Sequence, residues 1–210
     1  MHKLYILDFD GTVGDTNRLI TDTMQATLRE AGLPTRSREA CSKTIGLPLG
    51  DCFRALIPLD DTQVEQCTDI YRRIFTESHK PGVVPVFPGV IESIERWHDR
   101  GAIVSLASSR GHDSLSAFVR EMHLETYISL ILGADDVQRH KPDPAPVIQT
   151  LDHFGLTPGE AIVIGDMHYD ILMGKRAGCM TCGVTYGNGT EQELAEAGAD
   201  LITDSLLNVD

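Results

Sequence analysis

Short apolar runs alternate along the chain with segments of helical periodicity. The runs lack the polar alternation of a half-exposed strand, so they predict strands that are buried on both faces. Five such runs are present: Leu4–Leu7, Ile103–Ala107, Ile128–Leu132, Ile162–Ile164 and Thr181–Val184. Between them, apolar side chains recur on one helical face, as Val147, Ile148 and Leu151 do. This alternation predicts an α/β fold, with a parallel sheet covered by helices on both faces.

One long stretch interrupts the alternation. From about Thr16 to Pro85 only helical segments occur, and Gly-Pro pairs and single prolines separate them. This predicts about four helices inserted after the first strand. We therefore expect a Rossmann-like α/β core made of residues 1–14 and 86–210, and a small all-helical cap made of residues 15–85.

Charge limits the partners. The chain has 210 residues, 31 of them acidic and 18 basic, which gives a formal net charge of −13. A chain this acidic is repelled by nucleic acids and by anionic membranes, so we expect neither as a partner. If the protein binds a small anion, positively charged groups at the binding site must outweigh the negative electrostatic potential of the rest of the chain.

Cysteine usage and the N-terminus bear on the compartment. Five cysteines form an odd set, unlike the disulfide framework of a secreted protein. The apolar run Leu4–Leu7 is too short for a signal peptide, and no run reaches the roughly 20 apolar residues of a membrane span. We expect a cytoplasmic protein, either a monomer or a homodimer.

The first candidate site follows the first strand, in the sequence Asp8-Phe9-Asp10-Gly11-Thr12. A loop that bends at Gly11 can direct both carboxyl groups into one pocket. One carboxylate could then attack or hold a metal while the other moves a proton. The alternative is a solvated turn, because Asp and Gly are common turn residues. The buried strand that precedes these acids favours the site.

Two more strand ends carry polar groups. Ser108 and Ser109 follow the second run, where hydroxyl groups and backbone amides can hold a phosphate, although a simple turn with a helix cap would look the same. Lys141 precedes Pro142, which restricts its backbone to an extended form. A lone lysine usually faces solvent, so a functional role for Lys141 is supported only by the other candidate residues around it.

A second pair of carboxylates follows the fourth run. Asp166 lies in the loop after that run, and Asp170, four residues later, can share a face with it once a helix begins. Clustered carboxylate oxygens suit Mg²⁺. His168 lies between them, but with no second histidine nearby a surface position is the better interpretation.

The order and spacing of these motifs resemble those of the haloacid dehalogenase superfamily, over almost the whole chain. The motifs are Asp8-x-Asp10-Gly11-Thr12-x-x-Asp15, a serine at the end of the next core strand, Lys141-Pro142, and Gly165-Asp166-x-x-x-Asp170. The helical insertion is similar to that of the branch that contains phosphoglycolate phosphatase and β-phosphoglucomutase.

The resemblance implies a mechanism and a cofactor. Asp8 would attack phosphorus and become an aspartyl-phosphate, and Asp10 would protonate the leaving oxygen and then activate water. Mg²⁺ would be held by Asp8, the backbone carbonyl of Asp10, and Asp166. Asp170 would support Lys141 and the outer shell of the metal. The phosphoryl oxygens would be bound by the remaining motif residues: Gly11, Thr12, Ser108, Ser109 and Lys141.

The implied function is a Mg²⁺-dependent phosphatase that acts on a small phosphorylated metabolite and is similar to phosphoglycolate phosphatase. A sugar phosphomutase of the β-phosphoglucomutase type is the alternative. A true dehalogenase needs neither Asp10 nor a metal, and a receiver domain of signalling proteins lacks the helical insertion, so both fit less well. Specificity would lie in the cap, where the basic residues could also be ordinary solvated side chains: Lys43, Arg54, Arg72, Arg73, His79 and Lys80. Gly14 and the segment 84–87 are candidate hinges.

Overall fold

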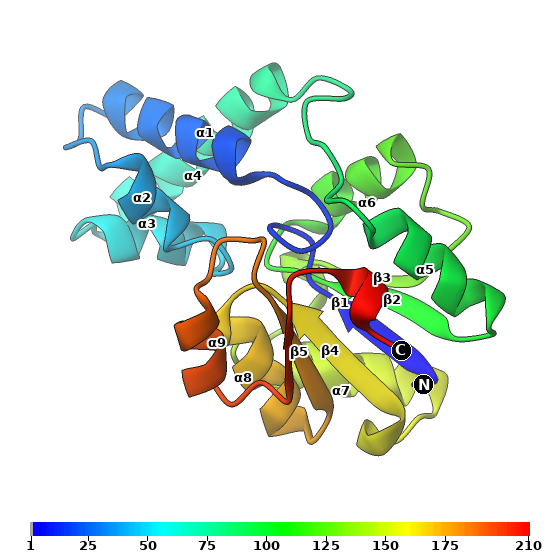
Figure 1. Ribbon diagram of the computed structural model, residues 1–210. Coiled ribbons are helices and arrows are strands. Elements are labelled where there is room, and N and C mark those ends of the chain that lie inside the picture. The colour runs from blue at the N-terminus through cyan, green and yellow to red at the C-terminus, as the bar shows by residue number, and fades with distance from the viewer. Residues whose placement is uncertain (1) are drawn as a thin grey trace.

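The computed structural model describes residues 2–210 and contains one parallel sheet of six strands (Figure 1). Their order across the sheet is β3-β2-β1-β4-β5-β6, which places the first strand in the middle. The strands are β1 (Leu4–Leu7), β2 (Ile103–Ala107), β3 (Ile128–Leu132), β4 (Ala161–Gly165), β5 (Met180–Val184) and β6 (Leu201–Thr203). The five predicted strands are confirmed to within one residue at each end. The edge strand β6 was not predicted.

Alternate side chains of the central strand enter two different cores, because successive residues of a strand point to opposite faces of the sheet. Leu4 and Ile6 pack with residues of α7 (Ala145–Phe154) and α8 (His168–Ala177). Tyr5 and Leu7 pack on the other face with α5 (Val90–Asp99) and α6 (His112–Glu121), where Tyr5 stacks on Trp97 with ring centroids 4.1 Å apart. The predicted covering of both faces by helices is confirmed.

The remaining short elements close the carboxyl-terminal half. Helix α9 (Glu191–Glu196) follows β5, and three turns of 3-10 helix lie at Ala134–Asp136, Pro158–Glu160 and Leu206–Asn208. Helix α8 ends at Gly178, which has a φ of 80°, and Thr190 accepts a hydrogen bond from the Glu193 amide at the start of α9. These ends were signalled by the sequence through a C-terminal glycine and a capping box.

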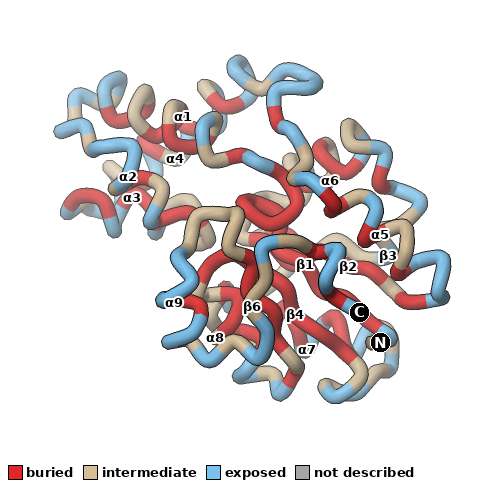
Figure 2. The backbone as a smooth tube through the Cα atoms, in the orientation of Figure 1, coloured by how far each residue is buried: buried red, intermediate tan, exposed pale blue. Residues whose placement is uncertain are grey.

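The insertion after β1 consists of four helices that lie together beside the sheet (Figure 1). They are α1 (Asn17–Glu30), α2 (Arg38–Ser42), α3 (Leu49–Leu56) and α4 (Asp61–Ser78). Buried apolar side chains such as Met24, Phe53 and Tyr71 line the inside of this group. In Figure 2 the inserted helices accordingly carry alternating buried and exposed stretches along the backbone. The predicted helical cap is thus present as a structural unit.

Two chain segments connect the insertion to the sheet. They run side by side, because the Asp15 amide donates to the Pro85 carbonyl (2.9 Å) and the Phe87 amide donates to the Val13 carbonyl (3.1 Å). Gly14 pairs with Val86 between these two hydrogen bonds. The hinge predicted for Gly14 and residues 84–87 therefore falls where these two antiparallel segments join the insertion to the sheet. Its movement stays a prediction.

Candidate active site

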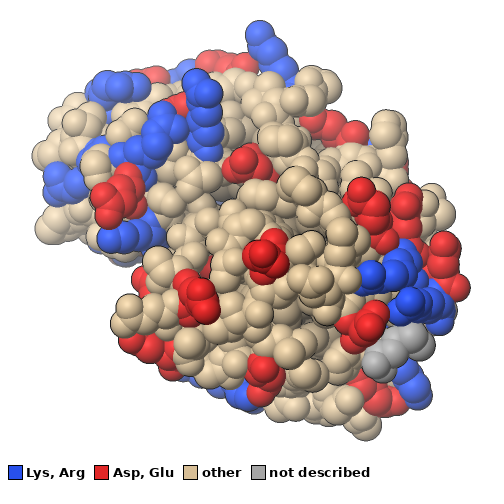
Figure 3. Space-filling view, in the orientation of Figure 1, with Lys and Arg blue, Asp and Glu red and all other residues tan. Residues whose placement is uncertain are grey.

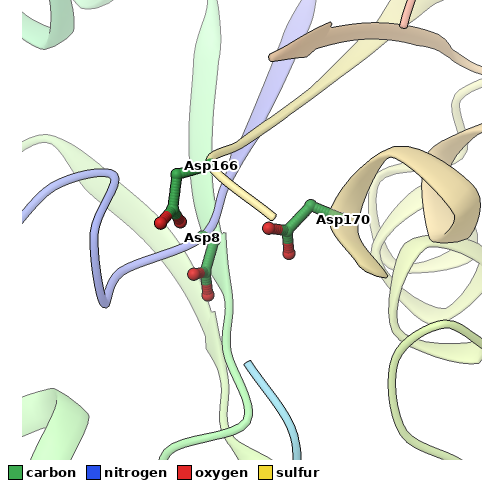
Figure 4. A group of neighbouring side chains, drawn as sticks. All are labelled: Asp8, Asp166 and Asp170. Carbon is green, nitrogen blue, oxygen red and sulfur yellow. The ribbon is translucent and has the colours of Figure 1, made fainter. Parts of the chain in front are cut away.

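The predicted residues meet where the central strands end. Asp8 follows β1, Asp166 follows β4, and Asp170 lies in the first turn of α8. Because the strands are parallel, their carboxyl ends lie at one edge of the sheet. One carboxylate oxygen from each residue lies within 4.8 Å of the others, and Figure 4 shows the Asp170 side chain directed from α8 toward Asp8 and Asp166.

Lys141 is buried between two of these carboxylates. Its Nζ atom donates to Asp8 Oδ1 and to Asp170 Oδ1, both at 2.6 Å, and its side chain is only 2% exposed. The Lys141–Pro142 peptide bond is cis. The prediction that Lys141 gains its role from its neighbours agrees with this position, and so does the predicted support of Lys141 by Asp170.

Burial changes the protonation of the cluster. Burial, followed by the charges of neighbouring carboxylates, raises the pKa of Asp8 and of Asp166, although Lys141 opposes this at Asp8. Burial alone would lower the pKa of Lys141, but Asp170 and Asp8 outweigh it and the Lys141 pKa is raised. Three buried carboxylates thus share one ammonium group, an excess of negative charge that a divalent cation would neutralise.

The donor set fits Mg²⁺. Mg²⁺ is bound by carboxylate and carbonyl oxygens together with water. Asp8 and Asp166 supply carboxylates, and the side-chain amide of Asn188 marks where a carbonyl joins them. Its Nδ2 atom donates to Asp166 Oδ2 (2.9 Å) and to the backbone carbonyl of Asp10 (3.4 Å), so this carbonyl and the Asp166 carboxylate lie close together. The oxygens that would hold a bound cation are those of Asp8, Asp166 and the Asp10 carbonyl.

Asp166 is held in place by two loops. The Thr12 hydroxyl donates to Asp166 Oδ1 (3.1 Å), and the Asn188 amide nitrogen donates to Asp166 Oδ2 (2.7 Å). The backbone amides of Gly11 and Thr12 donate to the carbonyls of Gly14 and Phe9. The contact of Gly11 and Thr12 with a phosphoryl group stays a prediction, because in this structure their polar groups serve the turn and Asp166.

The two serines lie beside Asp8 on the wall of a cavity. Ser108 is buried and accepts a hydrogen bond from the Arg110 amide (3.3 Å), while the Ser109 hydroxyl donates to the Gly46 carbonyl in the insertion (2.6 Å). Ser108 thus lines the same cavity as Asp8, and its contact with a phosphoryl group stays a prediction. Ser109 connects the sheet to the insertion, a contact that the sequence did not predict.

Arg110 is the main residue that the sequence analysis missed. Its Nη2 and Nε atoms donate to the two carboxylate oxygens of Asp10 at 2.7 and 3.1 Å. The guanidinium is buried and lies over the rings of Phe75 and Phe118, with its carbon 4.8 and 4.9 Å from their centroids. The signal available was its place directly after Ser108-Ser109, at the end of a buried strand.

Asn188 is the second missed residue. Besides holding Asp166, its Oδ1 atom accepts a hydrogen bond from Asn17 Nδ2 (2.5 Å), at the beginning of α1. Asn17 Nδ2 also donates to Ser42 Oγ (2.7 Å). The insertion is therefore linked by hydrogen bonds to the residue that holds Asp166. In the sequence, Asn188 is marked only by flanking glycines after β5.

A cavity of about 960 Å³ lies between the insertion and the sheet, and Asp8 and Asp10 form part of its wall. Of the basic cap residues, Arg72 and His79 also line it. Three of the others make ion pairs elsewhere: Lys43 with Glu39, Arg54 with Asp61 and Arg73 with Glu30. His168 is half-buried and does not line the cavity.

Asp8 and Asp10 are thus two carboxylates on one cavity wall, each paired with a basic side chain. The Lys141 ammonium donates to Asp8, and the Arg110 guanidinium donates to Asp10. Residues 5–184 match the family model of haloacid dehalogenase-like hydrolases. The chain belongs to that family. The family membership that the sequence motifs implied is therefore confirmed.

Individual members of the family match over nearly their full length. The Dickeya dadantii protein named "Probable phosphatase IndB" is 33% identical, and the match covers 100% of this chain and 92% of the other. Pyrophosphatase PpaX of Bacillus pumilus is also 33% identical, with 90% and 86% covered. A crystal structure from Bacteroides fragilis, described as a haloacid dehalogenase-like hydrolase, superposes with a TM-score of 0.92 at 26% identity and covers 98% of both chains.

Membrane spans and disulfides bear on the remaining predictions. In residues 2–210, no helix combines the length and apolar character that crossing a membrane requires. The five cysteines of the same range are all buried and form no disulfide. Burial raises the pKa of Cys179 to about 11 and of Cys182 to about 12, so both thiols stay protonated and unreactive near neutral pH.

Proposed function

We propose that the protein is a Mg²⁺-dependent phosphatase that hydrolyses a small phosphomonoester through an aspartyl-phosphate at Asp8. The observation that carries this proposal is the buried pairing of Asp8 with Lys141 at 2.6 Å, on the cavity wall and two residues before Asp10. A carboxylate with a cation beside it and an acid within reach suits in-line transfer of a phosphoryl group. The names of the Dickeya and Bacillus relatives, a phosphatase and a pyrophosphatase, support phosphate chemistry.

The proposed reaction has two steps. The Asp8 carboxylate attacks phosphorus, the bond from phosphorus to the alcohol oxygen breaks, and Asp10 gives that oxygen a proton. Asp10 then takes a proton from water, which attacks the aspartyl-phosphate and releases inorganic phosphate and free Asp8. Ser108 and Lys141 bind the phosphoryl oxygens during both steps. When bound, Mg²⁺ would neutralise the charge that develops on these oxygens.

We propose a division of labour between two parts of the chain. Residues 1–14 and 86–210 form the core domain that holds the catalytic residues, and residues 15–85 form a cap that covers the substrate. Contacts from both sides of the cavity support this division, such as the Ser109 hydroxyl on the Gly46 carbonyl. We further propose a cytoplasmic location, which the five cysteines without disulfides support.

A phosphate-release assay tests the function. Purified protein should release inorganic phosphate from a panel that includes phosphoglycolate, pyrophosphate, alkyl phosphates and β-glucose 1-phosphate in the presence of Mg²⁺. The release should stop with EDTA and return when Mg²⁺ is added in excess. Turnover that persists in EDTA would contradict the proposal. Conversion of β-glucose 1-phosphate to glucose 6-phosphate without phosphate release would favour the phosphomutase instead.

A further inference from the structure

The wall of the cavity that faces the insertion is mostly apolar. Ile20 and Met24 contribute from α1, Leu49 from α3, and Tyr71 and Phe75 from α4. All of these side chains are buried or half-buried in the surface of the insertion. At about 960 Å³, the cavity lies near the upper end of the range for small-molecule sites, so it has room for much more than a phosphoryl group.

The charged groups on the cavity wall balance one another. Apart from the catalytic pair of aspartates, two arginines (Arg72 and Arg110) and two further aspartates (Asp113 and Asp135) line it. The Arg110 guanidinium already binds both oxygens of Asp10. The Arg72 side chain is 72% exposed, so water screens its charge.

Two histidines, His79 and His140, also line this wall. His79 contacts Glu121 through its Nε2 atom at 2.9 Å, so a carboxylate already faces its ring. Among the described lining residues, no lysine or arginine is thus both buried and free to receive a second anionic group of a substrate.

From this lining we propose that the substrate is the phosphomonoester of an uncharged alcohol, and that the apolar part of the alcohol lies against α1, α3 and α4. The inference rests on the phosphatase function proposed above and narrows it. Pyrophosphate and phosphoglycolate each carry a second anionic group, which would enter an apolar space without a cation and lose its hydration. An uncharged apolar group would instead displace water from the walls formed by Leu49 and its neighbours.

A series of straight-chain alkyl phosphates tests the inference. Ethyl, butyl and hexyl phosphate have leaving groups of similar reactivity, so differences in kcat/KM report contacts of the alkyl chain. We expect kcat/KM to rise with length, by up to about fourfold for each methylene that becomes buried. Hexyl phosphate should exceed both phosphoglycolate and pyrophosphate. Equal kcat/KM along the series, or a preference for phosphoglycolate or pyrophosphate over hexyl phosphate, would overturn the inference.

Two substitutions of Leu49 locate the effect, because this half-buried residue begins helix α3 and tolerates change better than the buried core. Leu49→Ala should lower the ratio of kcat/KM for hexyl over ethyl phosphate by about fivefold. Leu49→Lys should raise kcat/KM for phosphoglycolate relative to hexyl phosphate, since its ammonium would supply the missing cation. The matched control is Leu207→Ala, which changes an exposed leucine outside the cavity and should leave both ratios unchanged.

The outcomes separate the two proposals. If no substrate of the panel releases phosphate, the phosphatase function itself is wrong. If phosphate is released but the alkyl series is flat in the wild type, the function stands and the substrate class is wrong. If the wild type shows the rise and Leu49→Ala keeps it, the alkyl chain does not lie on this wall and the inference fails at that point.

Discussion

At the scale of single residues, the pairing of Asp10 with Arg110 shapes the proposed chemistry. Both oxygens of Asp10 accept hydrogen bonds from one buried guanidinium, whose plane lies over two phenylalanine rings. A bidentate pair of this kind fixes the direction of the carboxylate as well as its position. Arg110 is therefore a positioning residue, because it acts on the leaving oxygen only through Asp10.

Replacing Arg110 should affect substrates unequally. In Arg110→Gln, Asp10 loses its bidentate partner but stays in place, so we expect kcat/KM for butyl phosphate to fall about 10- to 100-fold, less than the roughly 100- to 10,000-fold that a general acid contributes in full. The kcat/KM for 4-nitrophenyl phosphate should fall much less, because nitrophenolate leaves without protonation. Steady-state kinetics on both substrates provides the comparison.

Arg110→Lys is the conservative control for this experiment. Lysine keeps the positive charge but lacks the forked guanidinium that binds both oxygens of Asp10, so this variant should recover part of the activity on butyl phosphate. Circular dichroism should verify that both variants are folded, since breaking a buried ion pair is destabilising. Equal losses of kcat/KM on the two substrates would show that Arg110 does not act on the leaving oxygen through Asp10.

The difference between predicted and missed residues has a physical cause. Asp8 and Asp166 could be predicted to meet, because the ends of the neighbouring parallel strands β1 and β4 necessarily lie at one edge of the sheet. Lys141 lies in a loop well beyond the end of β3, so only the family resemblance indicated its place. Arg110 also follows a strand, but its partner depends on the direction of a long side chain and on the phenylalanines beneath it. That packing is tertiary and leaves no pattern in the sequence.

At the scale of elements, the loop after β5 closes tightly on the cluster. A Cβ atom at Gly187 would overlap the side chain of Asp166 and the carbonyl of Gly11. The loop therefore needs a glycine at this position for the backbone to come so close. The next residue, Asn188, donates a hydrogen bond to Asp166 and accepts one from Asn17. The loop therefore connects α1 to Asp166, which is a predicted metal ligand.

A single methyl group should disturb this loop. In Gly187→Ala the overlap forces the loop away from Asp166, so we expect a loss of stability of about 1–3 kcal/mol and weaker Mg²⁺ binding. Thermal unfolding and calorimetric titration with Mg²⁺ measure the two effects. Gly159→Ala is the matched control, because nothing lies within 4 Å of a Cβ atom there. Unchanged Mg²⁺ affinity in Gly187→Ala would show that the loop does not position the ligand.

The elements themselves were largely predictable. The apolar runs predicted five strands because a strand buried on both faces needs a continuous apolar sequence. The edge strand β6 has three residues with exposed and half-buried side chains, so it has no such run. The separation of the four inserted helices followed from Pro and Gly, whereas their packing around Met24 and Tyr71 could not be predicted, because it depends on which helical faces meet.

At the scale of the whole molecule, the negative charge is unevenly distributed. Residues 15–85 contain nine basic and ten acidic side chains, whereas the rest of the chain contains nine basic and 21 acidic ones. Figure 3 shows the same contrast, with Lys and Arg gathered over the four inserted helices. The cavity lies between these two parts. A phosphate must therefore approach an acidic core, which a bound divalent cation and Lys141 would make attractive to it.

The buried carboxylates should make the metal-free protein less stable as pH rises. The folded-state pKa values of Asp8 and Asp166 are raised to about 7 and about 8, so between about pH 4 and 8 the folded state binds more protons than the unfolded state. The free energy of unfolding then falls with increasing pH. We expect the melting temperature in EDTA to decrease from pH 5 to pH 8. A melting temperature that rises over this interval would contradict the raised values.

Mg²⁺ should reverse this loss. At a concentration of about 100 times its Kd it would stabilise the fold by about 2.7 kcal/mol, or roughly 5–10 °C in melting temperature for a chain of this size. The gain should be larger at pH 8 than at pH 5, because protons compete for the ligands. Asp166→Asn should abolish it, whereas Asp204→Asn, which changes an exposed carboxylate, should keep it. A Mg²⁺ shift that survives in Asp166→Asn would place the ion elsewhere.

The central claim is that Asp8 becomes phosphorylated during turnover. Rapid mixing of enzyme, Mg²⁺ and substrate, followed by acid quenching and mass spectrometry of the peptide that contains Asp8, tests it directly. We expect a transient phosphoryl group on Asp8, more of it in Asp10→Asn because hydrolysis of the intermediate is slowed, and none in Asp8→Asn, which should also release no phosphate. Phosphate release by Asp8→Asn, or turnover in which Asp8 never carries a phosphoryl group, would contradict the account.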